Sequence, residues 1–301
     1  MQQLFRISFL LMLFALLIAA AQSDSSAAEQ DTYMEIEDLR SNEGLLEGYK
    51  AYIKTAVCES DNCYIVQINF FWDLIGRFQK FDTIPGEGLT KLDHIPFTEL
   101  DYQKLDALLK DADSPLANYE KEELVKDTRS SAIDGFTGAT VLEIKESVIS
   151  GGVYSCYTLW HIAHGDIIDS LQAKTYASLD STLLEQIVSQ EDQEMNYFLI
   201  QHFSEQDYVT YLPQFLKTFE QGSGYYAKNA LEKMPEVVFS QSITQDFFAG
   251  HFEQLNYFSQ VALLKKLPAK SLTSSLETIL REALDDRSSV KNTLIKGLID
   301  N

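Results

Sequence analysis

The C-terminal half of this chain contains a short pattern that recurs at a nearly constant spacing. The segments KNALEKMP (228–235) and VALLKKLP (261–268) align at an offset of 33 residues, and each ends on proline. Weaker copies at 197–204 and 292–299 stand 31 residues before the first segment and 31 after the second. A helical unit that recurs at this period must stack on its neighbours to bury its apolar face. The spacing therefore predicts an array of helices at the C-terminal end.

Longer amphipathic stretches separate the copies, as at 208–219 (YVTYLPQFLKTF) and 271–284 (SLTSSLETILREAL). Each would supply the second helix of a pair. The pattern resembles that of HEAT-like repeat proteins over about residues 180–301. We therefore expect residues 151–301 to form an all-α, HEAT-like solenoid that docks a protein partner. A plain helical bundle is the alternative.

The first residues have the composition of a cleavable signal peptide. Arg6 precedes an apolar run from Ile7 to Ala21, which ends in three alanines before the polar sequence QSDSS. This order is typical of secretory signals. The run is also shorter than the roughly 20 residues of a membrane-spanning helix. We expect residues 1–21 to be removed, leaving a periplasmic or secreted protein with no membrane span, and a retained anchor is the alternative.

The mature chain is strongly acidic. Removing residues 1–21 takes away only Arg6 among the charged residues, so the formal net charge moves from −21 to −22. Such a surface repels nucleic acid and anionic lipid, which argues against nucleic-acid partners. Residues 22–47 are polar and acidic with few apolar anchors, and we expect them to be a mobile lead-in to the folded domain.

Two segments of strand-like composition flank the sequence CESDNC. In the second segment apolar residues recur at every other position from Tyr64 to Phe70, as in a half-buried strand. The pattern predicts a β-hairpin whose tip is closed by a Cys58–Cys63 disulfide, because exported thiols tend to oxidise. A redox-active pair is the alternative. Cys156 stands among apolar neighbours and is expected to be buried and unreactive.

A Pro- and Gly-rich loop (81–96) follows the hairpin and precedes a predicted helix. Thr98 and Asp101 have the spacing of a capping box, and Phe97 and Tyr102 that of a hydrophobic staple. The apolar stripe of this helix consists of Leu105, Leu108 and Leu109.

The segment from Asp134 to Thr140 reads DGFTGAT and directly precedes the helix-like sequence VLEIKESVIS (141–150). Thr140 and Glu143 match the T-x-x-E capping box, and the glycines suit a turn. These local features alone predict that the segment is the start of a helix.

The same seven residues resemble the D-x-x-(S/T)-G-A-T motif of FMN-binding domains in extracytoplasmic electron-transfer subunits. In that family a flavin transferase joins FMN through its phosphate to the hydroxyl of the final threonine. The resemblance covers about residues 45–150, and it implies an α+β, FMN-binding-like domain at 48–150. The residues that it assigns to cofactor binding are Thr140, Asp134, Thr137, Gly138 and Ala139.

The implied activity is electron carriage between redox partner proteins, so the chain would be a carrier rather than a complete enzyme. Small residues let a phosphate approach the backbone, where the amides at a helix start favour it. Two alternatives stay open. One is an FMN-binding-like domain that has lost its flavin, and the other is a non-catalytic exported scaffold in which the motif only caps a helix.

Other candidate sites have less support in the sequence. His161 and His164 stand three apart on a predicted helix and could face a metal or haem together, but no third ligand is apparent nearby and their apolar neighbours favour ordinary core packing. His94 lies beside Asp93 in the Pro-rich loop, but no nucleophile motif for hydrolysis accompanies the pair. The chain contains no Walker loop, dinucleotide fingerprint or zinc signature.

Overall fold

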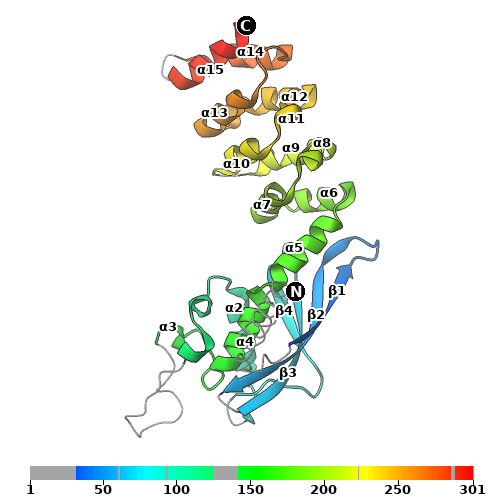
Figure 1. The fold of residues 1–301 in the computed structure, drawn as a ribbon, viewed down its shortest axis with the longest axis vertical. Helices are drawn as coiled ribbons and strands as arrows, with labels where there is room; N and C mark the ends of the chain where they lie inside the picture. Colours follow the sequence, from blue (N-terminus) through cyan, green and yellow to red (C-terminus); the bar gives the residue numbers. More distant parts are fainter. Residues whose placement is uncertain are drawn as a thin grey trace, which may run out of the picture. The chain divides into compact units, whose positions relative to one another are not determined.

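The structure is a computed structural model, and it describes residues 32–59, 62–91, 94–124, 142–222, 224–285 and 289–300. These residues form an α+β fold in which a four-stranded antiparallel sheet precedes a long series of helices (Figure 1). The expected signal peptide, 1–21, lies outside them. No helix in the described ranges is both long enough and apolar enough to cross a membrane.

The strands follow one another in the sheet in chain order. They are β1 (Tyr33–Arg40), β2 (Leu46–Glu59), β3 (Asn62–Trp72) and β4 (Phe78–Thr83). Strands β2 and β3 form the predicted hairpin around CESDNC. Alternate residues of β3 are buried, including Val66, Ile68 and Phe70, which confirms the predicted pattern.

Strand β1 corrects the expected lead-in, because the folded chain begins before residue 48. Met34 and Ile36 are half-buried, whereas Glu35 and Glu37 between and after them are exposed. The segment looked unstructured because its exposed face is acidic. Acidic side chains are common on edge strands, where they discourage pairing with other chains. Only pairing with β2 reveals the apolar face.

The described chain divides into two compact units, which are treated separately below. The first unit comprises residues up to 36, 51–70 and 81–160, and the second comprises 37–50, 71–80 and the residues from 161 onward. A domain boundary was expected between residues 150 and 151. The units instead divide between Trp160 and His161, within helix α4 (Val153–His164). Both units therefore contain strand segments as well as helix.

The first unit contains the predicted capped helix, α2 (Glu99–Lys110). Thr98 Oγ1 accepts a hydrogen bond from the Asp101 amide at 3.3 Å, and the Asp101 carboxylate accepts one from the Thr98 amide at 2.8 Å. The rings of Phe97 and Tyr102 meet edge to face, with 5.5 Å between centroids. The three leucines predicted to form the stripe are all buried. Cap, staple and stripe are thus confirmed.

Three short helices follow α2 in this unit. They are η2 (Pro115–Asn118), η3 (Lys121–Glu123) and α3 (Leu142–Lys145). Helix α3 is shorter than the predicted helix at 141–150, although Ile144 and Val148 are buried as expected. The chain then turns at Gly151, whose φ of +72° favours glycine.

The second unit contains the remaining helices. They are α5 (Ile167–Ala177), α6 (Ser181–Ser189), α7 (Gln193–His202), α8 (Glu205–Thr210), α9 (Leu212–Gln221), α10 (Tyr226–Lys233), α11 (Glu236–Phe239), α12 (Ser242–His251), η4 (Phe252–Gln254), α13 (Tyr257–Lys266), α14 (Ser274–Glu282) and α15 (Ser289–Ile299). Two series of contacts run through them. One joins α6, α9, α12 and α14, and the other joins α7, α10, α13 and α15.

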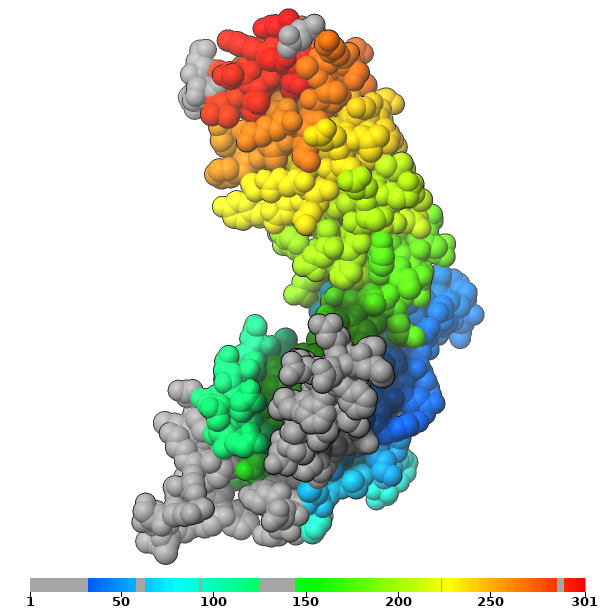
Figure 2. Space-filling view, in the orientation of Figure 1, coloured from blue at the N-terminus to red at the C-terminus, as the bar shows by residue number. Residues whose placement is uncertain are grey.

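All four copies of the sequence pattern fall on the second of these series, α7, α10, α13 and α15 (Figure 1). Two positions of the pattern are buried in every copy. The first position holds Ile200, Leu231, Leu264 and Ile295, and the second holds Phe203, Met234, Leu267 and Leu298. Figure 2 shows a continuous surface from the green through the yellow and orange to the red residues of this part of the chain. The recurring apolar positions thus bury the faces between neighbouring helices.

Candidate functional site

The motif residues predicted to hold a cofactor lie outside the described residues. They are Asp134, Thr137, Gly138, Ala139 and Thr140. The side chain of Cys58 is also outside them. Cys63 is disulfide-bonded and Cys156 is a free thiol, but the predicted Cys58–Cys63 pairing stays a prediction.

The described chain on either side of the motif is anchored in the first unit. Leu124 precedes the gap and Ile144 follows it, and both side chains are fully buried. Helix α3 also contacts η2. The segment that carries the motif therefore begins and ends at fixed points of the same core.

The turn that follows α3 is fixed by two hydrogen bonds. Lys104 Nζ donates to the Val148 carbonyl at 2.6 Å, and the Ile149 amide donates to Cys156 Sγ at 3.4 Å. Burial raises the pKa of the Cys156 thiol to about 12, so the thiolate is absent at neutral pH. Cys156 is therefore a packing residue, as the sequence indicates.

A small polar cluster joins strand β3, the Pro-Gly loop and helix α4 in this unit. Tyr64 donates its hydroxyl hydrogen to the Thr90 carbonyl at 2.9 Å, and its hydroxyl also lies against Ser155 Oγ. Thr90 Oγ1 is buried and has no hydrogen-bond partner in the part of the chain that the structure describes. A buried hydroxyl without a partner costs free energy.

A charged pair lies in the same part of the first unit. Lys91 Nζ is 2.8 Å from Asp101 Oδ2, and both side chains are largely buried. Burial by itself raises the pKa of Asp101, but hydrogen bonds from Lys91 and from Thr98 hold it below its usual value. This carboxylate is thus ionised at neutral pH and already occupied by its partners.

The histidines give no support to a metal site. His161 and His164 both lie on the last turn of α4. Over the described residues, no group of three or more His, Cys, Asp and Glu side chains is arranged to hold a metal ion. His94 is exposed, with its ring 6.2 Å from that of Tyr64, and Asp93 lies outside the described ranges.

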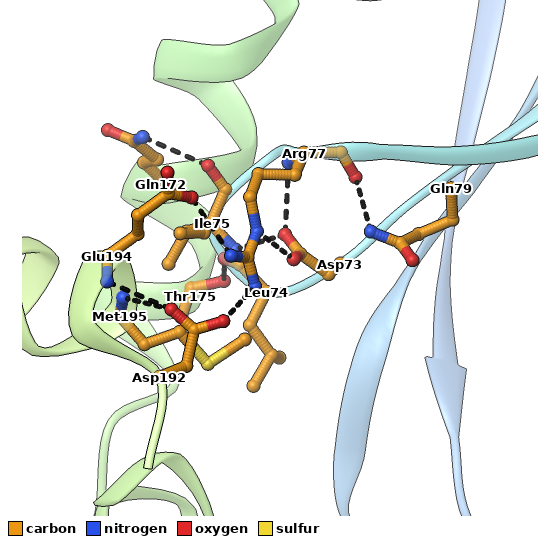
Figure 3. A network of polar contacts seen from close by, with 10 residues as sticks. All are labelled: Asp73, Leu74, Ile75, Arg77, Gln79, Gln172, Thr175, Asp192, Glu194 and Met195. Carbon is orange, nitrogen blue, oxygen red and sulfur yellow. Dashed lines mark hydrogen bonds and ion pairs between the residues drawn. The ribbon is translucent and has the colours of Figure 1, made fainter. Parts of the chain in front are cut away.

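The most extensive charged network lies in the second unit and surrounds Arg77 (Figure 3). The guanidinium of Arg77 contacts three carboxylates: Asp73 at 2.6 Å, Asp192 at 2.7 Å and Glu194 at 2.9 Å. The backbone is tied down by the same groups. Asp73 accepts hydrogen bonds from two amides of the β3–β4 turn, and Asp192 caps α7 by accepting from the Glu194 and Met195 amides.

The β3–β4 turn is also bound by helix α5. Gln172 donates to the Ile75 carbonyl at 3.0 Å, and the Thr175 hydroxyl donates to the Leu74 carbonyl (Figure 3). Each charged group in this network has a partner within it. The network therefore joins the sheet segment of the second unit to its first helices, and we assign it a structural role.

Replacing Arg77 by methionine should lower the free energy of unfolding by about 1–2 kcal/mol, because three carboxylates lose their shared cation. Burial alone raises the pKa of Asp192, but the hydrogen bonds from Arg77 and two amides lower it overall. The stabilisation by this carboxylate is present above its unfolded pKa and is lost as the pH falls through its depressed folded pKa. The loss in R77M should therefore shrink in acid. Urea unfolding of the variant and the unsubstituted chain at pH 7 and at pH 3 measures the loss of stability and its dependence on pH.

The matched control is Arg281→Met, which removes an arginine from the exposed Arg281–Glu277 pair on helix α14. That variant should lose at most about 0.5 kcal/mol. Equal losses in the two variants would contradict the assigned role of Arg77.

Comparison of the chain with protein-family models, with curated proteins and with solved structures finds no match. The resemblance carried by DGFTGAT is therefore the main pointer to function.

Proposed function

We propose that this chain is an exported electron carrier with FMN linked through its phosphate to the hydroxyl of Thr140. The observation that carries the proposal is the sequence DGFTGAT directly ahead of α3, in a segment whose ends are anchored by Leu124 and Ile144. Covalent attachment through Thr140 would keep the FMN on a protein that works outside the cytoplasm.

Two described residues of the first unit support a polar cofactor as part of this proposal. Thr90 Oγ1 is a buried hydroxyl in need of a hydrogen-bond partner. Lys145 is exposed on α3, five positions after Thr140, and supplies a positive charge near the motif in sequence. The FMN would supply reversible transfer of one or two electrons. The protein contributes the attachment hydroxyl, the hydrogen-bonding groups and a fixed position relative to the core.

We further propose that the helices of the second unit form a HEAT-like solenoid that docks a protein partner. Two series of helix contacts support this, because each helix of a series touches the next. The apolar positions that recur in α7, α10, α13 and α15 support it as well. Stacked helix pairs present extended surfaces of the kind that bind proteins. The partner would be a redox protein that exchanges electrons with the flavin.

The competing function is a non-catalytic exported scaffold in which DGFTGAT only starts a helix. The presence of α3 directly after the motif agrees with this reading as well. The two functions differ in one observable, the flavin.

The test is the intact mass and visible spectrum of the full chain, exported from a cell that also makes a flavin transferase. A carrier should gain the mass of one FMN less water and absorb near roughly 450 nm, where flavins absorb. The same chain without residues 1–21, retained in the cytoplasm, should stay colourless. A colourless exported chain of unmodified mass would favour the scaffold.

A further inference from the structure

The outer surface of the sheet in the first unit contains an open groove of about 710 Å³. Its lining consists of Tyr33, Tyr52, Lys54, Thr55, Ala56, Cys63 and Ile65. Side chains alternate between the two faces of a strand, so Tyr52, Lys54 and Ala56 of β2 share one face. Ile53 and Val57, on the opposite face, belong to the core. The groove thus lies on the side of the sheet that the core does not cover.

The groove is largely apolar and aromatic. The rings of Tyr33 and Tyr52 meet at 63° with 6.2 Å between centroids. Tyr33 is 55% exposed and Ile65 is 54% exposed, which is a high exposure for large side chains. The tyrosine hydroxyls are occupied, because Tyr52 donates to Gln67 at 2.5 Å and Tyr33 donates to Glu35 at 3.2 Å. A ligand would therefore contact the rings of the two tyrosines and not their hydroxyl groups.

Lys54 is the charged group in this lining, and it has no carboxylate within ion-pair distance among the described residues. Its neighbour on the same face of β2, Lys50, pairs with Glu37 at 3.5 Å. The charge of Lys54 is therefore available to a ligand. A cation beside exposed rings complements a ligand that has a negative charge and a flat apolar body.

We propose that this groove binds a small aromatic carboxylate, with the carboxylate against Lys54 and the ring against Tyr33, Tyr52 and Ile65. Glu35 lies beside the lining, because its carboxylate accepts the hydrogen bond from Tyr33. The site is independent of Thr140 and of any flavin. It holds whether the proposed electron-carrier function is correct or not.

The test is calorimetric titration of the full chain with 2-naphthoate, and with 2-naphthamide as the uncharged analogue. Lys54→Gln should weaken naphthoate binding about tenfold and leave naphthamide binding unchanged, because only the acid loses its counter-charge. Lys54→Arg should restore the affinity for naphthoate. Tyr33→Ala should weaken both ligands, because both use the ring. Thermal unfolding checks that each variant stays folded.

The matched control is Tyr225→Ala, which removes another exposed tyrosine, 62% exposed, at the start of α10 in the second unit. It should bind both ligands with the affinity of the unsubstituted chain. The proposal is overturned if naphthoate does not bind, if Lys54→Gln leaves its affinity unchanged, or if Tyr225→Ala weakens binding as much as Tyr33→Ala.

Discussion

Replacing Thr140 by valine should abolish covalent FMN attachment while the protein stays folded. Valine keeps the shape of threonine but lacks the hydroxyl through which the phosphate would be joined. The exported variant should therefore have the unmodified mass and no flavin absorbance, even in the presence of a flavin transferase. Intact mass and the visible spectrum measure this directly. A T140V protein that still gains the mass of FMN would exclude Thr140 as the attachment site.

Thr140→Ser is the control, because serine retains a hydroxyl and should retain part of the attachment. If Thr140 caps a helix as the sequence predicts, loss of its side-chain oxygen should also cost about 0.5–2 kcal/mol of stability. If the motif only caps a helix, T140V should lose stability in this range and the unsubstituted chain should already be colourless. Stability and colour together separate the two functions.

Replacing Gly48 by alanine should lower the free energy of unfolding by about 3 kcal/mol or more. A Cβ atom at Gly48 would lie 2.3 Å from the carbonyl oxygen of Trp72, on the neighbouring strand of the second unit. Backbone cannot rotate away as a side chain can, so the strands would have to separate. Trp72 itself is almost fully buried and donates its indole hydrogen to the Ala163 carbonyl at 2.9 Å. Denaturant unfolding followed by circular dichroism measures the loss.

The same substitution at Gly250, in helix α12, is the matched control. A Cβ there meets no atom within 4 Å, and the φ angle is not positive. Alanine is favoured over glycine in a helix by up to about 1 kcal/mol, so G250A should be neutral or stabilising. If both variants were equally stable, β2 and β3 would have room for a Cβ atom at residue 48, and the prediction would be wrong.

The features that the sequence predicted correctly depend on residues that are close to one another in the chain. Thr98 caps α2 through a residue three positions away, and the apolar alternation from Tyr64 to Phe70 needs only one strand. The repeat between residues 197 and 299 is similar in kind, because each helix has the same two apolar positions to bury. Local spacing determines which face of an element is apolar. It was enough to predict the order of sheet and helices.

Two predictions were wrong, and both concern segments whose structure depends on other parts of the fold. Strand β1 was expected to be part of a mobile lead-in, because residues 22–47 are polar and acidic with few apolar anchors. Only its pairing with β2 shows that Met34 and Ile36 lie on one half-buried face. Helix α3 was expected to continue to residue 150, but it ends at Lys145. Burial against a neighbour and the path of the chain are not encoded in the composition of a single segment.

The amino-acid sequence by itself determined the acidic surface, the helical repeat and the motif DGFTGAT, whose role at Thr140 stays a prediction. Only the tertiary structure brought Arg77 to Glu194, which is 117 positions away in the chain, and set Lys54 among the side chains of two other strands. Arginine, lysine and glutamate are ordinary surface residues, and nothing in their sequence neighbours marks a partner. Their roles depend on folding, because Coulomb attraction and apolar contact act over a few ångströms of space and not along the chain.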